Sequence, residues 1–116
     1  MKESNIILEK TFALGLRIIK LFKHLRENKV ERDLCLQLLR SGTSVGANVE
    51  EAMGGSSRKD FIHKLEIGYK EARETKYWIR LLKEASLLET SLADSFIKDI
   101  EEILKILTAI LKSSRP

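Results

Sequence analysis

Hydrophobic residues recur every three or four positions along most of the chain, which is the spacing of the buried side of an α-helix. Four such stretches are separated by short polar turns. They predict helices over residues 6–27, 31–53 and 58–85, and a fourth from a cap at Thr90 or Ser91 to Lys112. No stretch alternates apolar and polar residues over the length of a strand. The predicted fold class is therefore all-α, an up-down-up-down antiparallel four-helix bundle.

The second predicted helix passes through a segment, 41–48, whose two glycines would be typical of a loop. The helical spacing of apolar residues continues through this segment, so we interpret it as helix. Each glycine inside a helix costs about 1 kcal/mol relative to alanine, and close approach of another backbone would offset that cost. Gly42 and Gly46 form a G-x-x-x-G pattern, which is explained either by packing within the chain or by a contact between subunits.

Polar residues beside these glycines predict a hydrogen-bonded layer. Ser41 and Asn48 lie on the margin of the apolar row, and if buried they need partners, for which Glu71, Arg73 and Glu74 of the third helix are candidates. Together with an apolar pair on the third helix, the residues predicted to pack helices or to contact another subunit are Ser41, Gly42, Val45, Gly46, Asn48, Ile67 and Trp78.

The other helices have their own predicted inward residues. In the first helix these are Phe12, Ile18, Ile19, Phe22 and Leu25. In the third they form a heptad-like seam of Phe61, Leu65, Gly68, Ala72, Thr75, Ile79 and Leu82. In the fourth they are Phe96, Ile100, Ile103, Leu104, Leu107, Ile110 and Leu111. Acidic residues precede basic ones by four positions on the opposite face of the fourth helix, at Asp94/Lys98 and Glu101/Lys105, which predicts a solvent-facing side.

Helix-ending and helix-starting residues support these boundaries. Gly54 and Gly55 predict the end of the second helix, and Ser57, with Asp60 three residues later, predicts the cap of the third. At 116 residues the chain is expected to form one domain, 1–116, around a single core.

Composition narrows the setting of the protein. The chain is 43% hydrophobic and 33% charged, which excludes a disordered protein. No apolar run approaches the roughly 18 residues needed to span a bilayer, and no signal-peptide pattern opens the chain, so we expect a cytoplasmic protein with no membrane contact. Cys35 is the single cysteine and is expected to be a small buried apolar residue.

The pattern of chemically reactive residues argues against an enzyme. His24 and His63 have no companions at metal-ligand spacing, and no phosphate-loop glycine pattern is present. Cys35 has no nearby base, and the adjacent Glu50 and Glu51 cannot face each other as an acid/base pair. We therefore predict no catalytic residues, no cofactor and no metal.

Positive charge is the remaining chemical feature. The net charge is +4 and concentrates on the first and third helices. The predicted phosphate-contacting residues are Lys10, Arg17, Lys20, Lys23, Arg73, Lys76 and Arg80. Because there is no continuous basic run and little aromatic surface for stacking on bases, binding to RNA or DNA would be dominated by phosphates and weakly sequence-specific. An ordinary solvated face explains the same residues.

The segment from Leu38 to Ala52 with its R-S-G-T-S-V-G-A-N core, followed by residues 57–66 and 71–82, resembles the four-helix bundle family encoded in intervening sequences of bacterial 23S rRNA genes. The resemblance covers nearly the whole chain. It implies a bundle that associates as a homo-oligomer, in the form of a pentameric ring, with no catalytic activity. It also implies a distant kinship to the accessory protein of diversity-generating retroelements, which binds reverse transcriptase and nucleic acid.

Two hypotheses for function therefore remain. In the first, a non-enzymatic homo-oligomer presents lysine and arginine to RNA or DNA. In the second, the bundle is a structural or protein-interaction module, for example a partner of a reverse transcriptase, without direct nucleic-acid binding. Salt dependence distinguishes them, because phosphate contacts weaken steeply with salt whereas apolar contacts through Ile67 or Trp78 do not.

Overall fold

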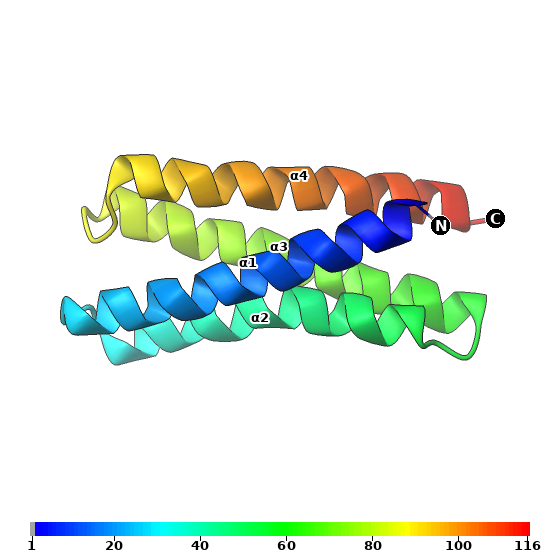
Figure 1. The fold of residues 1–116 in the computed structure, drawn as a ribbon, viewed down its shortest axis with the longest axis horizontal. Helices are drawn as coiled ribbons and strands as arrows, with labels where there is room; N and C mark the ends of the chain where they lie inside the picture. The colour runs from blue at the N-terminus through cyan, green and yellow to red at the C-terminus, as the bar shows by residue number, and fades with distance from the viewer. Residues whose placement is uncertain (1) are drawn as a thin grey trace.

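The computed structural model describes residues 2–116, apart from the side chains at positions 3 and 4. Its helices are α1 (Lys2–Glu27), α2 (Arg32–Met53), α3 (Arg58–Glu84) and α4 (Thr90–Ser114). They form an elongated bundle of 46 × 21 × 19 Å, in which the beginning of α1 and the end of α4 lie at the same end (Figure 1). Because α2 contacts α1 and α3, and α4 contacts α3 and α1, the helices occupy the corners of a four-sided bundle. The predicted all-α four-helix fold is confirmed.

The core follows the apolar seams of α3 and α4. Six of the seven predicted seam residues of α3 are buried, and Phe61 at its beginning is half-buried. The predicted inward face of α4 is also buried, except for Leu104, which is half-buried. Each helix buries the longest continuous apolar row in its sequence, so helical spacing was sufficient to identify what it buries.

The prediction for α1 was partly wrong. Ile18 and Leu25 are buried and Phe22 is half-buried, but the side chain of Phe12 is 64% exposed and that of Ile19 is 41% exposed. The physical reason is that α1 has two apolar rows on adjacent sides, and only one of them faces the bundle interior. The remaining core residues of α1 are Ile7, Thr11, Leu14 and Leu21.

Helix ends agree with the capping signals in part. Ser57 is the N-cap of α3, and its side chain accepts a hydrogen bond of 3.0 Å from the Asp60 backbone N–H. The helix α2 ends at Met53, directly before Gly54. The N-cap of α4 is Glu89 rather than Thr90 or Ser91, without a side-chain capping bond. The helix α1 begins at Lys2, earlier than the apolar spacing predicted.

The two glycines of α2 lie inside an uninterrupted helix, as predicted, and both face α1 of the same chain. A Cβ atom at Gly42 would lie 2.7 Å from Cγ1 of Ile18, and one at Gly46 would lie 3.1 Å from the backbone oxygen of Thr11. At Gly68 of α3 a Cβ atom would meet the Val45 backbone oxygen of α2 at 3.6 Å. Close helix contacts within the chain therefore account for the helical glycines of α2.

Candidate interaction surfaces

The first candidate surface lies where α1 meets α2, and we call it the α1–α2 surface. Its exposed members are Phe12, Leu16 and Ile19, with exposed fractions of 64%, 49% and 41%. They follow one another at steps of four and three residues and therefore form one row along α1. A shallow groove of about 200 Å³ runs beside them, and its α2 wall consists of Thr43, Gly46 and Ala47.

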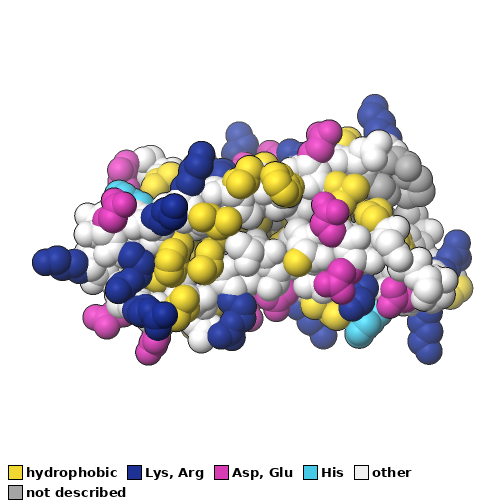
Figure 2. Space-filling view, turned by 60° about the horizontal axis from the view of Figure 1, so that its bottom comes forward, with side chains coloured by type: hydrophobic (Ala, Val, Ile, Leu, Met, Phe, Trp, Pro, Cys, Tyr) yellow, Lys and Arg dark blue, Asp and Glu magenta, His cyan; other side chains and the backbone are white. Residues whose placement is uncertain are grey.

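Figure 2 shows a side of the bundle on which hydrophobic side chains gather across the middle, with lysine and arginine around them toward one end. The row on α1 continues with the same spacing into Lys23 in one direction and Glu9 in the other. The apolar part of this surface is thus bordered by opposite charges at its two ends.

The second candidate surface is a row on the outer side of α3, and we call it the α3 row. Ile67 and Trp78 are half-buried, while Leu81 is 39% exposed, and the neighbouring Tyr77 is 50% exposed. The rings of Tyr77 and Trp78 meet edge-on, with centroids 5.2 Å apart. Since Trp78 also donates a hydrogen bond of 3.1 Å to the Glu74 carboxylate, this aromatic pair is held in a defined position.

Ile67 and Trp78 of the α3 row lie on the side of α3 that adjoins α2, whereas Tyr77 is turned roughly 100° from Trp78 around the helix and faces outward. Ile67, Glu71, Trp78 and Leu81 share one side of the helix by spacing with Lys64, which pairs with Glu51 of α2 at 3.0 Å. Burial and the nearby Glu74 raise the pKa of Glu71, although the Ser44 hydrogen bond acts in the opposite direction. Both apolar surfaces therefore border α2, one from each side.

Exposed apolar surface is segregated in this molecule. Among the described residues, six large hydrophobic side chains are exposed, and five of them belong to the α1–α2 surface or the α3 row. The sixth, Leu87, lies in the turn between α3 and α4. The helix α4 contributes none, so the exposed apolar area is not a general property of this bundle.

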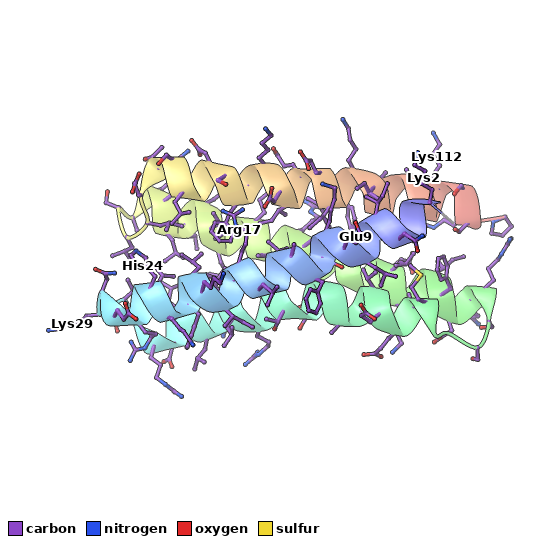
Figure 3. The ribbon with its side chains drawn as sticks, viewed as in Figure 1. Lys2, Glu9, Arg17, His24, Lys29 and Lys112 are labelled. Carbon is purple, nitrogen blue, oxygen red and sulfur yellow. The ribbon has the colours of Figure 1, made fainter. Side chains whose placement is uncertain are left out.

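Three of the seven residues of the predicted basic face form ion pairs with α4. Lys10 pairs with Glu102 at 3.0 Å and Lys76 pairs with Glu101 at 3.0 Å. Arg17 points from α1 toward α4 (Figure 3), where its guanidinium lies 4.0 Å from the centre of the Phe96 ring. It is also 2.5 Å from the Asp99 carboxylate and 3.1 Å from the Ser95 hydroxyl. These three basic residues connect helices of the bundle in addition to any role they have toward an anion.

The other predicted phosphate contacts lie in solvent. Lys20, Lys23, Arg73 and Arg80 are exposed, and within residues 2–116 none of them has an acidic partner within 4.0 Å. A further basic hollow of about 640 Å³ lies between α3 and α4, lined in part by Lys70, Lys112 and Arg115. Sequence reasoning did not include this hollow, because only the approach of α4 to α3 brings these residues together.

The polar layer on α2 differs from the predicted one in its partner. Ser41 is fully buried and accepts a hydrogen bond of 3.0 Å from the hydroxyl of Thr75, which was predicted as a seam residue rather than as a partner. The Asn48 side chain donates to the Ser44 backbone oxygen within α2 at 2.8 Å. Among the described side chains, no buried polar atom of this layer lacks a hydrogen-bond partner.

Reactive residues do not gather anywhere in the described part of the chain. The side chains that the structure describes include no group of three or more histidine, cysteine, aspartate or glutamate residues placed to hold a metal ion. His24 and His63 are exposed on α1 and α3. Cys35 is fully buried, and burial raises the pKa of its thiol. In the same residues, no helix has the length and apolar character needed to span a membrane.

Comparison with known proteins identifies the family. Residues 3–109 match the family model described as 23S rRNA-intervening sequence protein. The chain belongs to this family. It is also similar to a crystal structure of a protein of unknown function from the S23 ribosomal protein family of Bacteroides thetaiotaomicron. The two share 41% sequence identity with a TM-score of 0.92, over 95% of this chain and 98% of the other. Among curated proteins, none matches the chain.

Membership of this family accounts for the fold and does not assign an activity. The glycine-containing segment of α2 that carries the resemblance is the part of the helix that packs against α1 and α3. The motif by which this 23S rRNA-intervening sequence protein resembles its family is therefore a helix-packing motif in this structure.

Proposed function

We propose that this protein is a non-enzymatic homo-oligomer that binds RNA or DNA through phosphate contacts, with the pentameric ring that its family resemblance implies. The observation that carries the proposal is the segregation of exposed apolar side chains onto the α1–α2 surface and the α3 row. Soluble proteins seldom leave several large hydrophobic side chains together in water unless the patch contacts something. A second copy of the chain is one partner that is present wherever the protein is made.

Nucleic-acid binding is supported by the charges that α4 does not neutralise. Lys20 and Lys23 lie on α1, and Arg73 and Arg80 lie on α3, all of them exposed. One copy would hold phosphates weakly with so few cations. Repetition of the same cations around an oligomer would convert weak contacts into a multivalent surface of much higher avidity.

The first experiment measures native mass by light scattering at low and high salt, with and without a structured ribosomal RNA fragment. We expect an oligomer at both salt concentrations that binds the fragment at low salt only. An oligomer that ignores the fragment would contradict nucleic-acid binding, and a single-chain mass would contradict self-association.

A charge-neutralising variant sharpens this test. Arg73→Gln with Arg80→Gln is expected to weaken RNA binding and to reduce the slope of log K against log salt by about one unit for each phosphate that is no longer bound. Lys98→Gln with Lys105→Gln removes the same charge from the exposed face of α4 and is the matched control. Equal losses of affinity in both variants would mean that only net charge matters and that α3 has no specific part in binding.

The alternative function is a protein-interaction module, and the aromatic pair on α3 favours it. Tyr77 and Trp78 are residue types that frequently anchor protein interfaces. Binding of a protein partner through this pair would be less salt-sensitive than RNA binding. Under this alternative the natural protein would ignore the RNA fragment at low salt, and Tyr77→Ala would abolish binding of the protein partner.

A further inference from the structure

The two apolar surfaces suggest how copies of the chain meet. We propose that the α1–α2 surface of one copy receives the α3 row of the next copy, so that copies associate head to tail around a ring with α2 toward its inside and α4 toward its outside. This inference rests on the self-association proposed above and adds the identity of the two contacting surfaces.

The positions of the two surfaces relative to each other favour a closed ring. They lie on adjacent sides of the four-sided bundle, with α2 at their shared corner. Two different surfaces on opposite sides of a molecule would generate an open filament. Surfaces on adjacent sides turn each copy relative to the last, and an angle near a right angle closes a ring of about four or five copies.

The heights of the two surfaces along the bundle also match. Thr11 of α1 and Gly68 of α3 both pack against the same turn of α2, at Gly46 and at Val45. Helices α1 and α3 run in the same direction, and each rises about 1.5 Å per residue. Counting equal steps from Thr11 and Gly68 places Ile19 at the height of residue 76, next to Tyr77. In a ring of copies at equal height, Ile19 therefore meets Tyr77 of the neighbouring copy.

Two charged pairs at the borders of the surfaces have opposite signs in this register, although the same counting also places Lys23 at the height of Arg80 and Glu9 at the height of Glu66. The same counting places Glu9 within about 6 Å along the bundle axis of Lys70 on the neighbouring copy. It also places Lys20 within about 5 Å of the height of Glu74. Each of these two pairs flanks an apolar centre. Such pairs at the rim of an interface favour one register over others rather than adding much affinity.

Helix α4 has the character of an outer surface. Five of the six ion pairs in the described residues attach α4 or the chain end that follows it to α1 or α3. Its exposed face carries charged residues and no large hydrophobic side chain. This helix is suited to the water-facing outside of a ring, whereas the sides that adjoin α2 are not.

Cysteine cross-linking tests the pairing directly. The double variant Ile19→Cys/Tyr77→Cys is expected to give a ladder of covalent oligomers after mild oxidation or treatment with a short bismaleimide reagent. Each single variant is expected to give none, because like positions do not meet in a head-to-tail contact. Ile19→Cys paired with Leu87→Cys is the matched control, since Leu87 is equally exposed but lies outside the α3 row. Native Cys35 can stay in place because it is fully buried.

The possible outcomes distinguish failure of the head-to-tail pairing from failure of self-association, on which the pairing rests. A ladder from the Ile19/Tyr77 double variant alone supports head-to-tail pairing. A covalent dimer from Ile19→Cys alone would show that α1 meets α1 symmetrically and would overturn the inference while self-association stands. An oligomeric native mass without any ladder would overturn it in the same way. A single-chain native mass for the unmodified protein would overturn both.

A second measurement does not depend on cysteine geometry. Ile19→Arg disrupts the α1–α2 surface, and Tyr77→Asp disrupts the α3 row. Both positions are exposed enough that the bundle should fold. Each variant alone is expected to be a single chain, and an equal mixture is expected to form a one-to-one dimer through the two intact surfaces. A Tyr77→Asp variant that keeps the full oligomeric mass would overturn the inference.

Discussion

The sides of the bundle that adjoin α4 and the sides that adjoin α2 are constructed differently. Helix α4 is held to its neighbours above a buried apolar face by ion pairs, among them Lys10–Glu102, Arg17–Asp99 and Lys76–Glu101. Helix α2 is held by glycines that bring backbones together, and the apolar side chains beside it remain in solvent. The ion pairs of the described residues therefore concentrate on the α4 sides, and the exposed large apolar side chains of the helices concentrate on the α2 sides.

The largest effect is expected from disrupting the closest contact on the α2 side. Gly46→Leu places a side chain where even a Cβ atom would lie 3.1 Å from the Thr11 backbone oxygen. We expect loss of folding or a destabilisation of about 1–3 kcal/mol or more, with loss of the oligomer, measured by urea unfolding and native mass. Gly15→Ala is the control, because a Cβ atom there has no neighbour within 4 Å, and it should be neutral or stabilising by about 0.5–1 kcal/mol. An unchanged midpoint for Gly46→Leu would contradict the close contact.

A smaller change in folding but a large change in mass is expected at the α1–α2 surface. Phe12→Glu with Leu16→Glu adds two charges at positions that are already about half or more exposed, so the single chain should keep its fold. The oligomer should dissociate, as light scattering would show, while the helical circular dichroism signal persists. Leu87→Glu changes an equally exposed leucine in a turn and should leave the mass unaltered. Retention of the oligomer by the double variant would remove α1 from the interface.

The smallest effect is expected on the α4 side. The hydrogen bond and charge of Lys10 lower the pKa of Glu102 below its ordinary value of 4.5. A lowered pKa means that the folded state favours the ionised carboxylate, so the stabilisation is present above the ordinary glutamate pKa and is lost as pH falls through the lowered value. Glu102→Gln should therefore be slightly less stable than the natural protein at pH 7. The difference should vanish in strong acid, and a thermal melt series in pH would reveal a constant difference if this explanation is wrong.

The same contrast explains which parts of the structure could be predicted from the sequence. Helix α4 has a single apolar side, and the buried side of α3 is the one that carries its long heptad-like seam, so spacing alone identified their buried residues. Helix α1 has two apolar sides, and spacing cannot tell which of them faces the core, which is why Phe12 and Ile19 were placed inside. The exposure of Phe12 and Ile19 follows from the orientation of α1 relative to α2 in the folded bundle.

Ion pairs were harder to predict than burial. Spacing places Asp94 and Glu101 beside Lys98 and Lys105 on a side of α4 that is exposed as predicted, but these carboxylates pair with Lys83 and Lys76 of α3. Likewise, the basic residues of α1 looked free because their acidic partners are some 80 to 90 residues away in the chain. The relative height of two helices is set by core packing and turns, and it cannot be read from either helix alone.

The two glycines of α2 occupy equivalent positions in the G-x-x-x-G motif. They differ in whether a second substitution could compensate for their replacement. Gly42 faces the side chain of Ile18, so a larger residue at position 42 could be accommodated by a smaller residue at position 18. Gly46 faces a backbone oxygen of Thr11, and this oxygen is present whichever residue occupies position 11. Sequence drift can therefore exchange volume between positions 42 and 18, whereas position 46 has no second site that could rescue it.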